Sequence, residues 1–371
     1  AAILYVELLL IRWITANVVY IGFFSNFLLM ASFLGIGLGI LFGRRGRRIP
    51  ILPFALLLFV TVRLVYGAQL NVQIRATDEI FFGLAESQSA DVNFLVLPLV
   101  FVLVTALLAA LALPLGPLLR SMPPLRAYAT DIAGSLIGIA LFVVLSASGT
   151  DPLVWFAVAA LLVILMELGS GISRWTIPSI VAIGFVLVMV NHFLGPIDDR
   201  RDEYSPYYRV TVGQDADDVT HVLVNGIPHQ VIRETDSELK EPFYDQVYQW
   251  FPDRRFGDVL IVGAGSGSDV AVALERGAER IDAVEIDPVI QQVGIDLHPD
   301  APYADERVER IINDGRAHLA NTDKTYDLVV FALPDSLTLV STQANVRLES
   351  FLFTTEAFAA VRDHLSDDGV F

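Results

Sequence analysis

The first half of the sequence contains repeated apolar segments of the length needed to cross a lipid bilayer, and this feature constrains the fold most. A membrane-spanning helix needs roughly 20 predominantly apolar residues. Seven segments approach or exceed that length: 1–15, 18–42, 50–66, 93–113, 128–148, 151–168 and 175–195. A cleaved signal peptide would account for only one such segment. We therefore expect residues 1–196 to form a polytopic α-helical membrane domain of about seven transmembrane helices.

Charge is distributed unevenly between the two halves of the chain. Residues 1–196 contain 10 Lys and Arg against 8 Asp and Glu, whereas residues 197–371 contain 15 and 34. The acidic half argues against a nucleic-acid partner, because phosphate binding requires a basic face. The absence of cysteine excludes thiolate catalysis and zinc–cysteine or iron–sulfur sites. The six histidines have no zinc-ligand spacing, so we expect no bound metal.

Both ends of the sequence look interrupted. The chain begins without methionine inside an apolar segment, and it stops at residues 369–371, which are typical of the beginning of a strand. We therefore interpret the sequence as a piece of a longer protein.

The acidic half begins with a linker and a small β element, which we place at residues 197–257. Residues 208–212 and 220–224 have the pattern of two short strands, and Asn225-Gly226 is a strong turn signal. The apolar strand 258–262 then opens an α/β domain, which we assign to residues 258–371.

A glycine-rich loop follows that apolar strand. Gly263, Gly265 and Gly267 lie in the run Gly-Ala-Gly-Ser-Gly-Ser-Asp, and a helical stretch covers 270–276. A strand that leads through such a turn into a helix brings backbone N–H groups toward a ligand. Glu285 ends a second strand at 281–284, where an acid can accept hydrogen bonds from both ribose hydroxyls.

Two further strands complete this pattern. Asp314 and Gly315 follow a third strand that ends at 311–312, and residues 326–331 form a fourth. A glycine loop, two acids at strand ends and a fourth strand that leads into a loop suit a Rossmann-like sheet that binds a nucleoside. The sequence thus predicts a membrane domain followed by an α/β Rossmann-like domain.

The spacing of the glycines bears on the cofactor class. NAD favours a G-x-G-x-x-G arrangement, but here the third glycine is two residues after the second and Asp269 follows. A carboxylate in that turn would repel a pyrophosphate, whereas it could pair with the sulfonium of an S-adenosyl compound. We therefore expect an S-adenosyl ligand, with a dinucleotide and a ligand-free structural sheet as alternatives.

Residues 208–371 resemble the spermidine/spermine synthase family, the polyamine aminopropyltransferases. They look most like its prokaryotic relatives in which a helical membrane domain precedes the synthase-like domain. The resemblance rests on Asn225-Gly226 with Gln230, the loop 263–269, the segment 284–288, residues 305–308 leading to 314–316, and Tyr326-Asp327.

The resemblance implies a spermidine synthase-like transferase. Its co-substrate would be decarboxylated S-adenosylmethionine or S-adenosylmethionine, and its acceptor an amine or a related small molecule. Glu285 would contact the ribose and Asp314 the adenine amine. The full set of implied cofactor-binding residues is Gln230, Gly263, Gly265, Gly267, Asp269, Glu285, Asp287, Asp314 and Gly315.

The sequence departs from the family where the catalytic acid is expected. That position, directly after the fourth strand, is Ala332, and the second acid of the pattern remains as Asp335. The family's Tyr-His-Glu segment reads Tyr244-Asp245-Gln246. An attacking amine must lose a proton before it can act as a nucleophile. We assign catalytic roles to Asp335 and Tyr244, with Asp245 able to line the same pocket; a helix cap or a solvated loop acid is the alternative for Asp335.

Three functions stay open at this stage. The chain could be a membrane-anchored transferase, a transporter or sensor whose soluble domain binds an S-adenosyl nucleoside, or an inactive scaffold. The expected partners are the lipid bilayer and a small-molecule acceptor, and a homodimer is compatible with the sequence.

The side of the membrane on which the soluble domain lies is ambiguous. The arginines within 44–48 mark a cytoplasmic loop of a prokaryotic inner membrane by the positive-inside rule. Counting spans from there puts residue 197 outside, whereas a domain that uses an S-adenosyl co-substrate belongs in the cytoplasm. We favour the cytoplasm.

Overall fold

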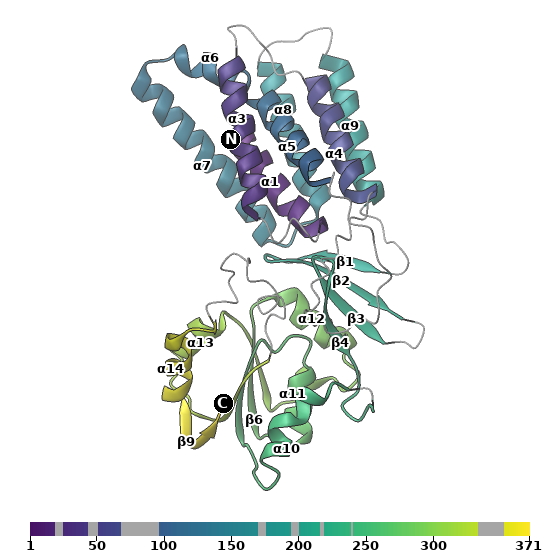
Figure 1. The fold of residues 1–371 in the computed structure, drawn as a ribbon, viewed down its shortest axis with the longest axis vertical. Helices are drawn as coiled ribbons and strands as arrows, with labels where there is room; N and C mark the ends of the chain where they lie inside the picture. Colours follow the sequence, from purple (N-terminus) through teal and green to yellow (C-terminus); the bar gives the residue numbers. More distant parts are fainter. Residues whose placement is uncertain are drawn as a thin grey trace. The chain divides into compact units, whose positions relative to one another are not determined.

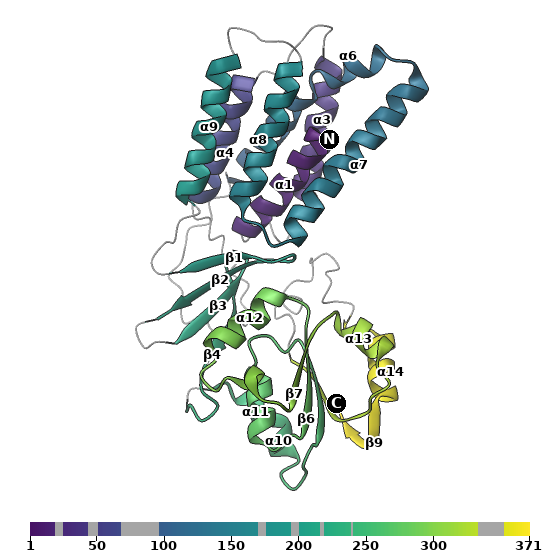
Figure 2. The same cartoon turned by 180° about the vertical axis from the view of Figure 1, so that it is seen from behind.

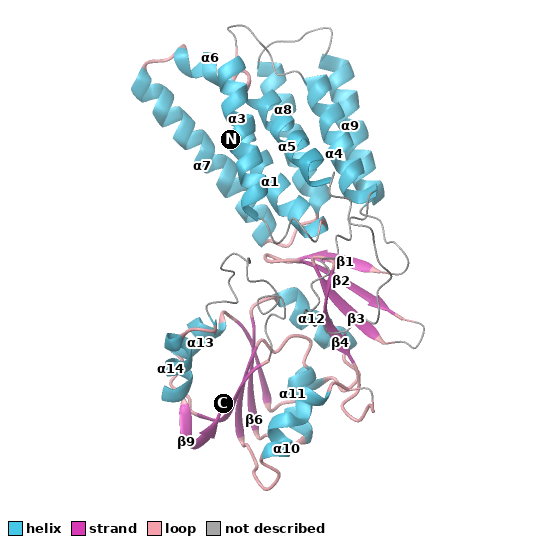
Figure 3. Ribbon diagram, viewed as in Figure 1, coloured by secondary structure: helices cyan, strands magenta, loops and turns pink. Residues whose placement is uncertain are grey.

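The computed structural model describes residues 1–18, 25–43, 51–67, 96–169, 176–193, 200–215, 219–238, 240–332 and 352–371. The chain divides into two compact units. The first comprises residues 1–75, 88–197 and 202–209, and the second comprises residues 76–87, 198–201 and 210–371. The described part of the first unit consists of helices and most of one strand, and that of the second contains the other strands (Figure 1, Figure 3).

Within the described residues, each of the seven apolar segments overlaps one helix of the first unit. These helices are α1 (Ala2–Asn17), α3 (Ser25–Phe42), α4 (Ile51–Gly67), α5 (Val96–Ala112), α7 (Pro124–Ala147), α8 (Pro152–Gly169) and α9 (Thr176–Phe193), and a short α6 (Leu115–Arg120) connects α5 to α7.

Only part of this helical unit meets the length expected of a membrane span. Among the described residues, three stretches are long and apolar enough to cross a bilayer: Val96–Arg120, Pro124–Ala147 and Pro152–Gly169. Three further apolar helices are shorter: Asn26–Phe42, Ile51–Tyr66 and Thr176–His192. The count of seven spans therefore stays a prediction.

Glycines allow α3 and α5 to pack closely. A Cβ atom at Gly39 would lie 2.5 Å from the carbonyl oxygen of Ala109, and one at Gly35 would lie 2.5 Å from that of Thr105. No atom lies within 4 Å of a Cβ built at Gly37, which sits between them in sequence. One face of α3 therefore packs against α5, and small residues are required on that face.

A short segment after the last helix, residues 202–209, belongs to the helical unit. It contains most of β1 (Arg201–Tyr204), whose Tyr204 is buried and packs edge-on against Trp155 at a ring distance of 5.4 Å. The guanidinium of Arg12 donates to the carbonyl oxygens of Ser205, at 2.9 Å, and of Tyr207. Because the arginine satisfies main-chain carbonyls, this segment is anchored to α1.

The second unit opens with an antiparallel β meander. It contains β2 (Arg209–Gln214), β3 (Thr220–Val224) and β4 (Ile227–Ile232), with Val210 opposite Val224 and Val222 opposite Gln230. Asn225 and Gly226 connect β3 to β4 with φ values of 51° and 82°. Two positive φ values in a two-residue loop are the geometry of a tight hairpin turn, as the Asn-Gly pair predicts.

A parallel sheet follows, in the strand order β7-β6-β5-β8-β9. Its strands are β5 (Asp258–Val262), β6 (Arg280–Glu285), β7 (Val308–Ile312), β8 (Tyr326–Phe331) and β9 (Leu365–Val370). Strand β5 is buried throughout its last four residues. Val259 and Ile261 face one hydrophobic cluster, and Leu260 and Val262 face another on the opposite side.

Helices cover both faces of this sheet (Figure 2). The helices α10 (Gln246–Trp250), α11 (Ser268–Glu275) and α12 (Pro288–Leu297) contribute to the first cluster, and α13 (Gly315–Asn321) and α14 (Thr355–Asp363) to the second. Two 3₁₀ turns, η1 (Pro242–Asp245) and η2 (Pro302–Ala304), complete the described elements of this unit. The predicted Rossmann-like domain is confirmed.

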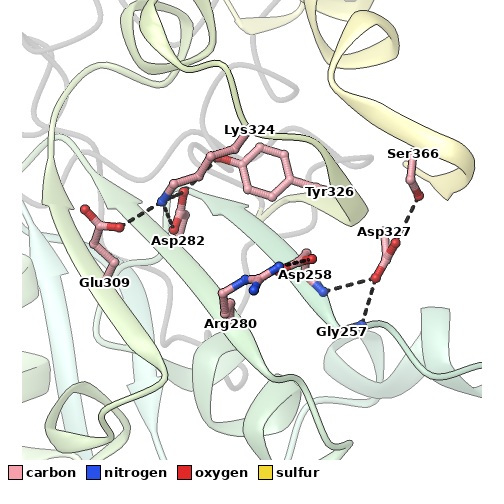
Figure 4. A network of polar contacts seen from close by, with 9 residues as sticks. All are labelled: Gly257, Asp258, Arg280, Asp282, Glu309, Lys324, Tyr326, Asp327 and Ser366. Carbon is pink, nitrogen blue, oxygen red and sulfur yellow. Dashed lines mark hydrogen bonds and ion pairs between the residues drawn. The ribbon is translucent and has the colours of Figure 1, made fainter.

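Polar side chains tie the strands together at their amino ends (Figure 4). The buried carboxylate of Asp282 on β6 accepts hydrogen bonds from the hydroxyl of Tyr326, at 2.8 Å, and from Lys324 Nζ, at 2.9 Å, and Lys324 also pairs with Glu309 of β7 at 2.8 Å. Asp327 of β8 accepts from the backbone N–H of Asp258 at 3.1 Å. This edge is occupied by structural contacts, which leaves the carboxyl edge for a ligand, as is usual in parallel α/β sheets.

Candidate functional site

The glycine loop at the carboxyl end of β5 adopts a conformation that few other residues could take. Gly263, Gly265 and Gly267 have φ values of 80°, 56° and 97°. The side chain of Gln230, from β4, lies directly against Gly265, where an added Cβ would be 1.9 Å from its Nε2 atom. Its Oε1 atom accepts a hydrogen bond from the Ser266 N–H at 3.0 Å. Gln230 thus connects the meander to the loop, and its role as a site residue stays a prediction.

Glu285 lies at the end of β6, beside the same loop. Its Oε2 atom accepts a hydrogen bond from the Gly265 N–H at 2.8 Å, and its Oε1 atom accepts one from the Asp287 N–H at 2.9 Å. Burial raises the pKa of Glu285 to about 7, although these backbone N–H groups act in the opposite direction. A carboxylate has about four acceptor positions. The N–H groups of Gly265, Asp287 and Ile286 use part of this capacity, and the rest is open to a hydroxyl group of a ligand.

Two of the predicted acids are helix N-caps. Asp287 is fully buried, and its Oδ1 atom accepts hydrogen bonds from the N–H groups of Val289, at 2.9 Å, and Ile290, at 3.4 Å. Asp314 is half-buried and accepts one from the Ala317 N–H at 2.9 Å. Both side chains begin a helix at the carboxyl edge of the sheet. This capping role follows from the Asp-Pro pair at 287–288, a pattern typical of helix starts.

Gly315 has a packing role next to Asp314. An added Cβ would lie 2.3 Å from Cγ1 of Val262, the last residue of β5. The absence of a side chain therefore lets the start of α13 approach the central strand.

Tyr244 and Asp245 differ in their surroundings. The Tyr244 hydroxyl shares a hydrogen bond with Ser268, the first residue of α11. Burial, and to a smaller extent the negative charge of Asp269, raises the pKa of Tyr244. Asp245 is buried and pairs with Lys240 and Arg276, each at 2.8 Å. Burial alone would raise the pKa of Asp245, but hydrogen bonds from these two cations lower it overall. Its charge is thus compensated within the fold, whereas Tyr244 faces the end of the glycine loop.

Asp269 lies in the first turn of α11 and is half-buried. Burial raises the pKa of its carboxyl group to about 7. The hydroxyl of Tyr303, from η2, donates to the Gly265 carbonyl oxygen at 2.7 Å, and its ring packs against Gly267. Tyr303 has no signal in the sequence near the loop, because it lies 38 residues downstream of Gly265.

A cavity of about 370 Å³ opens between the meander and η1. Gln230 and Tyr244 form part of its wall together with Glu241, Phe243 and His229. Sequence analysis did not single out these last three residues, although Glu241 and Phe243 directly precede the Tyr244 segment. The cavity brings two of the predicted site residues to one space.

The end of β8 lies beside the glycine loop. The Ala332 N–H donates to the carbonyl oxygen of Val262 at 2.9 Å, which places residue 332 at the carboxyl edge next to the central strand. Its methyl group offers neither a charge nor a proton acceptor. The predicted catalytic residue Asp335 lies outside the described residues.

These features follow one another along the carboxyl edge. In the order β7, β6, β5 and β8, the edge presents Asp314, Glu285, the glycine loop and Ala332. After β5 the chain continues to β6 on one side, and β8 lies on the other side of β5. The glycine loop therefore lies at the topological switch point of the sheet, which is the usual ligand position in such sheets. The fold is that of a Rossmann-type α/β domain, with the glycine loop and two acids together at the carboxyl edge of its sheet.

Comparison with known proteins specifies this class further. Residues 251–371 match the family model described as the spermine/spermidine synthase domain. The polyamine aminopropyltransferase of Methanocaldococcus jannaschii is 30% identical over 116 residues, which cover 30% of this chain and 36% of that protein. That of Pyrobaculum calidifontis is 27% identical over 173 residues, or 45% of this chain and 56% of that protein. The carboxyl-terminal part of the chain is thus similar to the spermine/spermidine synthase domain.

The matches are partial. The chain spans between 36% and 56% of the length of these two curated relatives. Among solved structures, spermidine synthase from Thermotoga maritima aligns with a TM-score of 0.34 at 19% identity, over 47% of this chain and 53% of that one.

Proposed function

We propose that the protein is an integral-membrane, spermidine synthase-like transferase. It binds decarboxylated S-adenosylmethionine or S-adenosylmethionine and transfers an alkyl group to an amine or a related small acceptor. The observation that carries this proposal is Glu285, whose carboxylate is fixed by the Gly265 and Asp287 N–H groups at 2.8 and 2.9 Å and keeps acceptor positions for a ribose. The spermine/spermidine synthase match to residues 251–371 supports the class of reaction.

The residues at the carboxyl edge suit an S-adenosyl nucleoside. Glu285 would accept from the ribose hydroxyls, and Asp314, on the neighbouring strand end, would lie toward the adenine. Gln230 and the loop N–H groups would hold the part of the ligand above β5. The sulfonium supplies an electrophilic carbon, so the protein's part is to bind, orient and deprotonate the acceptor.

The membrane part of the proposal is supported by the helical unit. Three stretches of described residues reach spanning length with apolar sequences, and α7 exposes large apolar side chains such as Leu136, Ile137 and Val144. A helix that is apolar on its exposed side is stable in lipid rather than in water. Anchoring would keep the transferase domain at the bilayer surface.

A nucleoside-binding sensor without transferase activity is the second candidate. Ala332 favours it, because the residue at the end of β8 beside the loop cannot take a proton from an amine. In this candidate the cofactor site would work as a receptor, and binding would not lead to product.

Isothermal titration of the detergent-solubilised full chain tests the proposal. We expect methylthioadenosine and S-adenosylmethionine to bind, and Glu285→Ala to weaken binding by about 1.5–3 kcal/mol, the range for hydrogen bonds to a charged group. Glu306→Ala, which removes an exposed carboxylate on the loop before β7, is the matched control and should change nothing. Equal affinities of wild type and Glu285→Ala would refute the assignment, and product analysis with decarboxylated co-substrate separates the transferase from the sensor.

A further inference from the structure

Glu7 is a buried acidic residue in the interior of the helical unit. It lies on α1, which packs against α3, α4, α5, α7 and α8, and it is only 4% exposed. Within the described residues, the Glu7 carboxyl group has neither a hydrogen bond nor an ion pair. Arg12, on the same helix, instead donates to main-chain carbonyl oxygens of residues 205 and 207. The acid is therefore enclosed by helices without a cation to neutralise it.

Glu7 lies at about the same depth as a buried hydroxyl group of α4. Trp13 of α1 contacts Tyr66 of α4 at a ring distance of 5.3 Å, and both helices approach their carboxyl ends at this contact. At a rise of about 1.5 Å per residue, Glu7 is about 9 Å back along α1, and Thr61 is about 7.5 Å back along α4. The two side chains therefore belong to one level of the helical unit.

Three buried hydroxyl groups occur near the midpoints of helices that pack against α1. They belong to Ser32 of α3, Thr61 of α4 and Thr105 of α5. Thr105 Oγ1 donates to the Ala31 carbonyl oxygen at 3.2 Å, which holds α5 and α3 at one level. The hydroxyls of Ser32 and Thr61 donate to carbonyl oxygens of their own helices, at 2.9 and 2.8 Å. Because their protons are used in this way, the hydroxyl oxygens remain as acceptors in the middle of the unit.

A second buried acid, Glu167, lies close to the carboxyl end of α8, a helix that packs against α1. It is 6% exposed, and its Oε1 atom accepts a hydrogen bond from the hydroxyl of Thr176 on α9 at 3.2 Å. Its Oε2 atom is buried and has no hydrogen-bond partner among the described residues. An unpaired carboxylate is costly in apolar surroundings, so such a group takes up a proton. Glu7 and Glu167 both have this environment.

We propose that Glu7 and Glu167 carry protons through the helical unit, with Glu7 as the central proton-binding site and Glu167 as the site near the end of α8. The inference goes beyond the transferase reaction and rests on the membrane part of the proposed function. Acids that face the interior of a membrane helix bundle are typical of proton pathways. Each carboxyl group takes up a proton that comes from water and releases one that returns to water, so the step needs no further reactant.

A structural role of the two acids is separable from proton transfer by substitution with glutamine. The hydrogen bond between Thr176 and Glu167 joins α9 to α8, so it also stabilises their packing. Glutamine has nearly the same volume as glutamic acid and keeps a carbonyl oxygen that accepts this bond, but it cannot release a proton. Glu7→Gln and Glu167→Gln should therefore keep the fold and lose proton transfer.

The test measures proton flux into liposomes that contain the purified full chain and a trapped pH-sensitive dye. A potassium gradient with valinomycin provides the driving potential. We expect the wild type to conduct protons, and Glu7→Gln and Glu167→Gln to fall to the level of protein-free liposomes. Asp131→Asn, which removes an exposed acid of α7 in the same unit, is the matched control and should conduct like the wild type. Thermal unfolding and methylthioadenosine binding should be the same for all four proteins.

Modification by dicyclohexylcarbodiimide measures the bound proton directly, because this lipid-soluble reagent reacts with protonated carboxyl groups. The carboxyl oxygen bonds to the central carbon of the reagent, the proton moves to one of its nitrogens, and rearrangement gives an N-acylurea that retains all atoms of both. Peptide mass spectrometry of the treated wild type should find the adduct on Glu7 and on Glu167. The same treatment should abolish the proton flux.

The outcomes separate this inference from the proposed function. Wild-type flux at the level of protein-free liposomes, or full flux in Glu7→Gln, overturns proton transfer while the transferase proposal stands. An unmodified Glu7 overturns its role as the proton-binding site. If Glu7→Gln does not fold, full flux in Glu167→Gln overturns the pathway. Release of the chain from membranes by alkaline carbonate would overturn the membrane part of the proposed function and this inference with it, whereas nucleoside titration tests the transferase part independently.

Discussion

At the level of single residues, Glu285 links protein stability to pH. Burial raises its pKa in the folded protein to about 7 from an ordinary value near 4.5. The folded state therefore binds this proton more tightly than the unfolded state, so this group makes stability fall as pH rises from about 4.5 to 7 and has no further effect above that range. We expect Glu285→Gln to reduce this fall, as measured by thermal unfolding of both proteins between pH 4.5 and pH 8. Parallel pH profiles for the two proteins would contradict the assignment.

Gly265 allows a prediction that separates backbone strain from crowding. Both Gly265 and Gly277 have positive φ values, 56° and 88°, but only at Gly265 would a Cβ meet another group, Gln230 at 1.9 Å. Alanine should therefore strain the backbone at both positions, at a typical cost of about 1–3 kcal/mol. Only Gly265→Ala should displace Gln230 and abolish methylthioadenosine binding, which titration would measure. Retention of full affinity by Gly265→Ala would show that Gln230 does not need its observed position.

Asp335 remains the sequence-based prediction for the proton acceptor in aminopropyl transfer. General-base groups commonly contribute about 10²–10⁴-fold to rate. Asp335→Asn should therefore remove most turnover with putrescine and decarboxylated S-adenosylmethionine while nucleoside binding persists, and Ala332→Asp should raise turnover. Product analysis by chromatography measures both. If neither variant changes polyamine formation and wild type forms no product, the aminopropyltransferase proposal fails and another acceptor must be sought.

The limits of prediction from sequence differ between the residues of the site. Glu285 and the glycines are recognisable because their roles depend on local order: strand, turn, helix and strand end. Tyr303 could not be found in this way, since it reaches Gly265 only through the packing of η2 across the fold, at 2.7 Å to the carbonyl oxygen. The pairing of Asp245 with Lys240 and Arg276 is likewise tertiary, and sequence alone left Asp245 as a candidate pocket residue.

At the level of elements, the strands were easier to predict than the helix boundaries. The strands at 258–262 and 326–331 occur as expected, because buried parallel strands have continuous apolar sequences bounded by polar residues. Helix α11 begins at Ser268 rather than near 270, since Gly267 can act as its N-cap in a left-handed conformation. The cap is set by backbone geometry, which apolar periodicity does not report.

The packing of α3 on α5 gives a matched pair of substitutions. Gly37→Ala adds a methyl group where no atom lies within 4 Å, whereas Gly39→Ala adds one 2.5 Å from the Ala109 carbonyl oxygen and 2.6 Å from Ala112 Cβ. Gly37→Ala should stabilise the protein by up to about 1 kcal/mol through helix propensity. Gly39→Ala should destabilise it by about 1–3 kcal/mol through overpacking. Thermal unfolding in one detergent measures both, and similar changes for the two variants would contradict the observed helix interface.

At the level of the whole molecule, composition alone cannot count the membrane spans. At a rise of 1.5 Å per residue, an 18-residue helix such as α3 or α9 is about 27 Å long, slightly short of the roughly 30 Å hydrocarbon core. Such a helix can span a bilayer only if its ends or the lipid adapt. The apolar segments were therefore recognisable as helices from the sequence. How many of them span a bilayer depends on the thickness of the membrane, which the sequence does not specify.

The orientation of the chain can be measured directly because the sequence contains no cysteine. We place single cysteines at Ser121, between α6 and α7, at Ser148, between α7 and α8, and at Glu306 in the synthase-like domain; all three positions are exposed. Arginines on either side of Ser121 predict a cytoplasmic location, and a spanning α7 then puts Ser148 outside. Since the proposed co-substrate is cytoplasmic, Glu306→Cys should behave like Ser121→Cys.

A membrane-impermeant maleimide applied to intact spheroplasts should therefore label Ser148→Cys alone, and permeabilisation should expose the other two. Labelling of Glu306→Cys in intact spheroplasts would place the synthase-like domain outside, as the count of seven spans implies. In that case its nucleoside would have to be exported or supplied from outside, and a sensor would become the better proposal. Identical labelling of Ser121→Cys and Ser148→Cys would instead show that α7 does not cross the bilayer.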